Sequence, residues 1–231
     1  MLFETSRQVG RIPLILVLGK CAAHTRQFIN MWMASQTFAD SIVIGVKQEA
    51  LEPLRHDRVV ELPRLEVSSQ DSCLCCGLRS ALGDSLRSIF FEALNDRSKR
   101  LDRVLIESDS IETSKLAHTL RHTPFLGQRY VHQMSVRVVG AAFASNASPS
   151  MPSHVFPSLD SLRGLDPLSN KARQMLILFS SKACCAPTQF NAWADEVKQN
   201  LPYQEVFYLN GEEDHSIDSL QIALGFGKNH K

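Results

Sequence analysis

Short apolar runs rich in branched side chains recur along the chain between longer segments of mixed polarity. Several of these runs are apolar on consecutive residues, which is typical of parallel strands buried on both faces of a sheet. The pattern predicts six strands, at 14–18, 41–46, 104–107, 136–139, 175–179 and 205–209.

Apolar residues at helical spacing lie between some of these strands. One predicted helical face comprises Leu78, Leu82, Leu86, Ile89, Phe90 and Leu94, and another comprises Phe190, Trp193, Ala194, Val197 and Leu201. Pro187 and Thr188 precede the second face and are typical of a helix start. Alternating strands and helices predict an α/β fold, a three-layer sandwich with a mostly parallel central sheet.

The organisation of the chain favours one domain. Its 231 residues are 44% hydrophobic and 21% charged, enough for a single large α/β core. The stretch 145–170 repeats Ser and Pro without a steady period, so we expect a long loop there. We therefore interpret 1–231 as one domain.

Charge and hydropathy exclude some partners. The 25 Lys and Arg nearly balance the 24 Asp and Glu, so no overall field favours nucleic acid or an anionic membrane. No apolar run reaches the roughly 18 residues that span a bilayer, and residues 1–10 lack the apolar core of a signal peptide. We expect a cytoplasmic protein.

The cysteines provide the first candidate chemistry. Cys73, Cys75 and Cys76 supply three thiols within four residues, a set that suits Zn²⁺ or a similar soft or borderline ion. A fourth ligand would come from elsewhere or from solvent, and His24 is the first candidate. The alternative is that these small side chains only pack in the core. Sequence alone leaves that alternative open and favours a metal site.

Four segments, at 12–30, 71–94, 101–110 and 175–184, follow one another along nearly the whole chain. Taken in this order, they resemble the CobW family of metal-chaperone P-loop GTPases. The first is 12–30, where that family has a strand, the phosphate loop GxxGxGKT and a helix. Gly19 matches the first glycine of the loop, but Ala22 and His24 take the places of the later ones. Glycines let backbone N–H groups converge on phosphate, so their loss argues against a working loop.

The positions that contact phosphate and Mg²⁺ in that family are also changed. Thr25 takes the place of the lysine, and Arg26 takes the place of the Ser or Thr that binds Mg²⁺. Lys20 or Arg26 could supply a displaced positive charge.

The second segment carries the most specific resemblance. Cys73, Cys75 and Cys76 match the family signature GCxCC, which precedes an amphipathic helix as it does here, although Ser72 replaces the glycine. The resemblance implies that these three thiols are the metal ligands.

The third and fourth segments resemble the strands that carry catalytic and guanine-reading residues. Glu107 matches the glutamate of Glu-x-x-Gly, although Ser110 replaces the glycine. Glu107 would be catalytic only if nucleotide hydrolysis survives, and it could instead bond the start of the next helix. In the motif Asn-Lys-x-Asp, Lys182 persists but Ser181 and Cys184 replace Asn and Asp, which argues against selective GTP binding.

The resemblance implies a degenerate nucleotide site made of Gly19, Lys20, Thr25, Arg26 and Lys182. The first hypothesis is a pseudo-GTPase that binds zinc or a related ion and acts in metal trafficking or cobalamin-type metal insertion. One alternative is an active GTP- or ATP-binding metallochaperone with a divergent loop, and another is an inert partner subunit or scaffold. The enzyme question stays open, with the inactive form favoured.

The resemblance also implies partners. Family members serve metal-dependent client proteins, so we expect such a client or a complete CobW-type homologue as the partner, and a homodimer stays open. The family's C-terminal domain is expected to be absent, since the four segments account for nearly all 231 residues.

Overall fold

The computed structural model describes residues 11–19, 21–34, 38–46, 53–62, 74–96, 100–108, 120, 122–140, 142–143, 154–155, 173–180, 187–200 and 205–210. Seven strands form one sheet in the order β3-β2-β4-β1-β5-β8-β9, and every neighbouring pair is parallel. The strands are β1 (Ile12–Gly19), β2 (Ser41–Val46), β3 (Val59–Leu62), β4 (Arg103–Ser108), β5 (Tyr130–Gly140), β8 (Arg173–Ser180) and β9 (Glu205–Asn210).

All six strands predicted from apolar runs are present in this sheet, and the prediction of a mostly parallel sheet is confirmed. β3 is an addition at one edge of the sheet, where it pairs with β2 alone. Its four residues are largely half-buried, with Glu61 exposed, so it lacks the fully apolar run of the inner strands.

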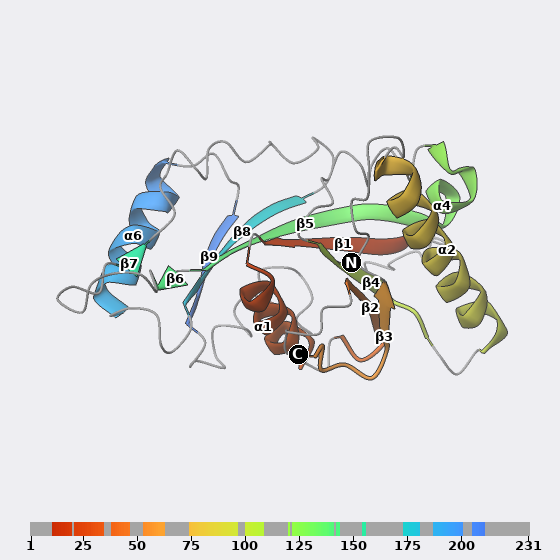
Figure 1. Ribbon diagram of the computed structural model, residues 1–231, viewed down its shortest axis with the longest axis horizontal. Coiled ribbons are helices and arrows are strands. Elements are labelled where there is room, and N and C mark those ends of the chain that lie inside the picture. Colours follow the sequence, from red (N-terminus) through yellow and green to blue (C-terminus); the bar gives the residue numbers. More distant parts are fainter. Residues whose placement is uncertain are drawn as a thin grey trace, which may run out of the picture.

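Helices cover both faces of the sheet, which confirms the three-layer arrangement (Figure 1). On one face, α1 (Ala22–Met33) packs Phe28, Ile29 and Trp32 against Ile15 and Val17 of β1. On the opposite face lie α2 (Leu74–Asn95) and α4 (Pro124–Arg129). None of the described helices is long and apolar enough to cross a membrane.

The face of the sheet that α2 covers is also packed by apolar side chains of a helix against β1. Leu82, Leu86 and Ile89 of α2 are buried against Leu14 and Leu16 of β1, whose side chains alternate with those facing α1. Because β1 is buried on both faces, its apolar side chains are consecutive, which is the feature that identified it in the sequence.

The C-terminal part of the chain adds α6 (Pro187–Asn200) between β8 and β9. This helix begins at the Pro187 that marked its predicted start, and Trp193, Ala194 and Val197 are buried. Within the predicted loop 145–170, β7 (His154–Val155) pairs antiparallel with β6 (Ala142–Phe143), and the rest of the loop lies outside the described residues.

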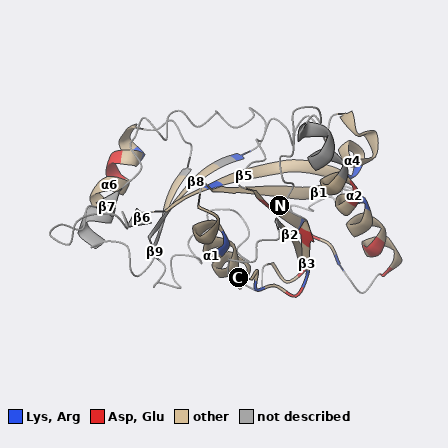
Figure 2. Ribbon diagram, in the orientation of Figure 1, with Lys and Arg blue, Asp and Glu red and all other residues tan. Residues whose placement is uncertain are grey.

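The parallel strands bring their carboxyl ends to one edge of the sheet. Leu18 of β1 is in register with Ser108 of β4, and Gly19 is in register with Val138 of β5. Ligands of open parallel sheets bind beyond the carboxyl ends of the strands. In the view of Figure 2, basic and acidic residues are interspersed over the described part, as the near-neutral composition predicts.

Candidate functional site

The connection from β1 to α1 occupies the place where the sequence resembles a phosphate loop. β1 ends at Gly19 and α1 begins at Ala22, with Cys21 as the N-cap residue. The backbone N–H of Thr25 donates to the Cys21 carbonyl at 3.0 Å, and the Thr25 hydroxyl donates to the same oxygen at 3.0 Å. The first helical turn is therefore already closed where a phosphate loop would still be non-helical.

Gly19 has a packing role at this connection. A Cβ at Gly19 would overlap the Thr25 side-chain oxygen and would lie 3.2 Å from the Val138 carbonyl oxygen. Thr25 itself is 1% exposed. Its side chain thus lies between the start of α1 and the end of β1. Because Gly19 has no side chain, α1 can pack this close to β1.

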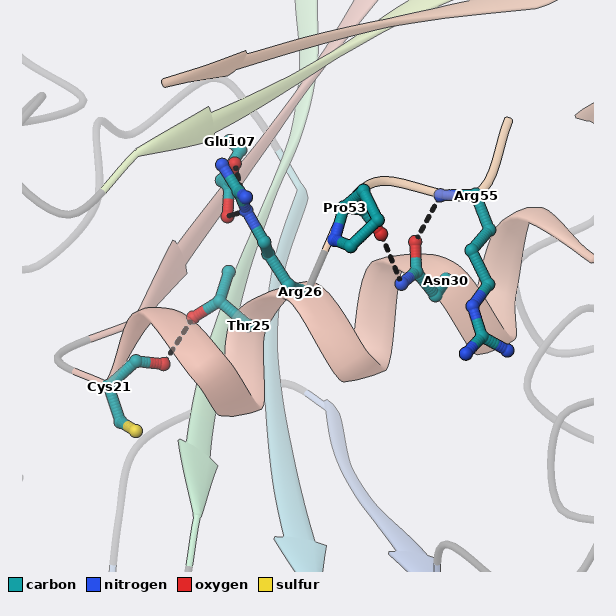
Figure 3. Close-up of polar contacts among 7 residues, drawn as sticks. All are labelled: Cys21, Thr25, Arg26, Asn30, Pro53, Arg55 and Glu107. Atoms are coloured by element: carbon teal, nitrogen blue, oxygen red, sulfur yellow. Dashed lines mark hydrogen bonds and ion pairs between the residues drawn. The ribbon is translucent and has the colours of Figure 1, made fainter. Parts of the chain in front are cut away.

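A buried ion pair joins α1 to the carboxyl end of β4 (Figure 3). Arg26 Nε donates to Glu107 Oε1 at 3.1 Å and to Glu107 Oε2 at 3.3 Å, and the two side chains are 3% and 5% exposed. Burial of either charge alone would be strongly unfavourable, because a low-dielectric interior solvates ions poorly. The two charges therefore stabilise each other in place of solvent.

Space for this carboxylate comes from Gly45 of β2. A Cβ at Gly45 would lie 3.0 Å from Glu107 Oε2 and 2.5 Å from Leu54 Cδ1. The Leu54 and Glu107 side chains therefore converge over Gly45, on the face of the sheet that α1 covers.

Asn30 of α1 fixes the segment that carries Leu54 (Figure 3). Its Nδ2 donates to the Pro53 carbonyl at 3.1 Å, and the Arg55 N–H donates to Asn30 Oδ1 at 2.8 Å. One side-chain amide thus binds the backbone on both sides of Leu54. This contact holds an apolar side chain beside the ion pair.

His24 lies on α1 against the end of β5. A Cβ at Gly140 would overlap the His24 ring, so the imidazole occupies the space that this glycine leaves. Burial lowers the pKa of His24 below its usual value of 6.5, which favours the neutral form that binds metal ions.

Two of the three thiol candidates belong to another helix, α2. α2 begins at Leu74, so Cys75 and Cys76 belong to its first turn, while their side chains and Cys73 lie outside the described part. A set of three thiols fits Zn²⁺ chemically. His24 stays a predicted fourth ligand, because the thiols that it would join lie outside the described part of the chain.

Within the described ranges, no group of three or more His, Cys, Asp and Glu side chains is arranged to hold a metal ion. Lys20 and Lys182 of the predicted nucleotide site also lie outside these ranges. Cys21 is exposed and free.

The described residues do not fit a Mg²⁺-nucleotide at this edge. The carboxylate of Glu107 is bonded to Arg26, and α1 begins at Ala22, three residues after Gly19. Sequence reasoning named both charged residues but missed their pairing. The missed signal is that Arg26 shares a helical stripe with Ile29 and Met33, since an arginine on an apolar stripe requires a buried acid.

No family model and no curated protein matches the chain. Among solved structures, it is similar to the Zn(II)-bound YjiA GTPase from E. coli, with a TM-score of 0.46 and 13% sequence identity. The alignment covers 87% of this chain and 57% of that one, so the chain spans less than two thirds of that protein's length. A likeness at this level assigns neither family nor activity.

Proposed function

We propose that the chain is a metal-binding pseudo-GTPase, which binds Zn²⁺ or a related ion through Cys73, Cys75 and Cys76 and does not hydrolyse nucleotide. The observation that supports the absence of nucleotide hydrolysis is the start of α1 at Ala22, the third residue after the end of β1 at Gly19. Among the described residues, the Thr25 N–H already donates to the Cys21 carbonyl, whereas a phosphate loop keeps such N–H groups for phosphate.

The proposed binding of Zn²⁺ rests on the three thiols and on their position in the chain. Three thiols around the first turn of α2 suit a soft or borderline ion, and the partial positive charge of a helix N-terminus favours thiolates. Bound zinc would be held for transfer or insertion, in line with the resemblance to metal chaperones. A metal-dependent client is the partner that this function requires.

The test is elemental analysis of tag-free purified protein, run beside a titration with fluorescent GTP and Mg²⁺. We expect near-stoichiometric zinc and no saturable nucleotide binding. Cys75→Ser should lower the zinc content severalfold, whereas the matched change Cys21→Ser, at an exposed free cysteine, should leave it unchanged. Tight Mg²⁺-dependent GTP binding would overturn the pseudo-GTPase assignment, and equal zinc loss in both variants would overturn the ligand assignment.

A second experiment addresses the alternative of an active enzyme with a divergent loop. The double change Thr25→Lys and Arg26→Thr restores the residue types that contact phosphate and Mg²⁺. We expect it to restore no binding, because α1 still begins at Ala22 and the residue at 25 still points at Gly19. Nucleotide binding by this variant would mean that side chains alone, and not the backbone, had abolished the site.

A further inference from the structure

Glu107 holds an unusual position for a neutralised acid. It lies at the carboxyl end of β4, at the edge where parallel sheets bind ligands, and it is 5% exposed. A buried carboxylate requires a counter-charge or a proton. Here the counter-charge belongs to the chain itself.

We propose that Arg26 is a built-in cation, whose guanidinium occupies the position from which a divalent metal ion would neutralise Glu107. It thereby closes this edge to hard cations such as Mg²⁺ and Mn²⁺ and leaves metal binding to the thiols. The inference rests on the proposed function, since it explains which metals this chain selects.

The geometry makes the guanidinium and a metal ion mutually exclusive. Arg26 Nε lies 3.1 and 3.3 Å from the two carboxylate oxygens, so one donor engages both. A Mg²⁺ ion would bind such an oxygen at about 2.1 Å. It would have to displace the guanidinium, because two cations cannot approach the same carboxylate from the same side.

The surroundings favour guanidinium over a hydrated ion. Leu54 meets the carboxylate over Gly45, and Asn30 holds the Leu54 segment at both neighbouring residues. Mg²⁺ gives up its water molecules reluctantly and retains several in protein sites. Guanidinium is weakly hydrated and is suited to a site with an apolar wall.

The test creates the metal site that Arg26 excludes. Mn²⁺ serves as the probe, and its binding is followed by electron paramagnetic resonance and by thermal unfolding with and without 1 mM Mn²⁺. We expect Mn²⁺ to leave the Tm of the wild-type protein unchanged. Arg26→Ser should lower the Tm by about 10 °C, because Glu107 stays buried and loses the guanidinium that neutralises it. Adding Mn²⁺ should raise the Tm of this variant by at least half of that decrease.

Two further variants assign the effect to Glu107. The double variant Arg26→Ser with Glu107→Gln should show no response to Mn²⁺, because the carboxylate has been removed. Arg87→Ser is the matched control, since Arg87 pairs with Asp84 at 3.1 Å on the surface, with side chains 47% and 68% exposed. It should change neither the Tm nor the Mn²⁺ response.

If Arg26→Ser does not fold, Arg26→Gln supplies the same test, because it keeps a donor toward the carboxylate but removes the charge. A Mn²⁺ response in either variant that disappears with Glu107→Gln supports the proposal. The proposal would be overturned if Mn²⁺ neither bound to these variants nor raised their Tm. It would also be overturned if the wild-type protein bound Mn²⁺ in a way that depends on Glu107. Zinc content is measured on the same samples, so a protein without zinc would refute the thiol site separately.

Discussion

The two faces of the sheet are covered by similar apolar side chains, and each face carries buried or half-buried polar contacts that can be compared. On the α1 face, the buried contact joins two charges, Arg26 and Glu107. On the α2 face, Tyr130 donates its hydroxyl to the Leu86 carbonyl at 2.6 Å, and His132 Nε2 lies 2.8 Å from the Ser135 hydroxyl. Losing half of a charged contact leaves a stranded ion, whereas losing half of a neutral one leaves a single unmet hydrogen bond.

The largest effect is expected from breaking the charged contact. Glu107→Gln should lower the free energy of unfolding by about 3 kcal/mol, because Arg26 stays buried and loses the carboxylate that neutralises it. Urea denaturation measures this loss. Asp84→Asn, in the exposed pair with Arg87, should cost less than about 0.5 kcal/mol. Similar losses in the two variants would show that the buried pair is not special.

A smaller effect is expected at Gly45, which makes room for the charged contact. Gly45→Ala would place a Cβ 2.5 Å from Leu54 Cδ1 and 3.0 Å from Glu107 Oε2, and should cost about 2 kcal/mol in urea. Gly83→Ala on α2 is the control, because its Cβ would meet only Leu126 Cδ1 at 3.7 Å. A helical alanine there should add about 0.5 to 1 kcal/mol. Destabilisation by both changes would contradict this packing.

On the α2 face, removing the Tyr130 hydroxyl should have a modest effect. Tyr130→Phe keeps the buried ring but removes the donor to Leu86, so about 1 kcal/mol should be lost in urea. If Tyr130→Phe lowered the free energy of unfolding as much as Glu107→Gln, the charged and the neutral contact would not differ in their contribution to stability.

The smallest effect is a pH dependence. Burial lowers the pKa of His132 below 6.5, although a hydrogen bond with the Met134 carbonyl opposes the shift. The unfolded chain therefore binds a proton more readily, so stability is retained above pH 6.5 and falls as the pH drops below it. His24 acts in the same direction.

Unfolding free energies between pH 5 and pH 8 measure this dependence. His132→Asn should flatten the decline, because the buried imidazole that binds a proton more readily in the unfolded chain has been removed. A steeper decline in His132→Asn would mean that the imidazole is stabilised as a cation.

The inner strands could be predicted from sequence because burial on both faces leaves a direct signature of consecutive apolar residues, as in Leu14, Ile15, Leu16 and Val17. β3 was missed because a four-residue edge strand, with Val59 and Val60 half-buried and Glu61 exposed, has no such signature. β6 and β7, with two residues each, are too short for any periodicity.

The candidate site was predictable only in part. Glu107 and Arg26 were found through motif positions, but their mutual contact joins residues 81 positions apart and depends on how α1 lies on the sheet. The same holds for Asn30, Gly45 and Leu54, whose residue types are ordinary in sequence. The thiol site stays a prediction, since Cys73 and the side chains of Cys75 and Cys76 lie outside the described residues.

The order of the strands has a consequence for synthesis. β1 lies at the centre of the sheet, yet both of its neighbours, β4 and β5, come much later in the chain, and β5 ends only at Gly140. At ordinary translation rates, the apolar face of β1 waits roughly 10 s for its partners after leaving the ribosome. Such an unpaired strand is prone to aggregate, so the nascent chain should depend on chaperones until β5 has emerged.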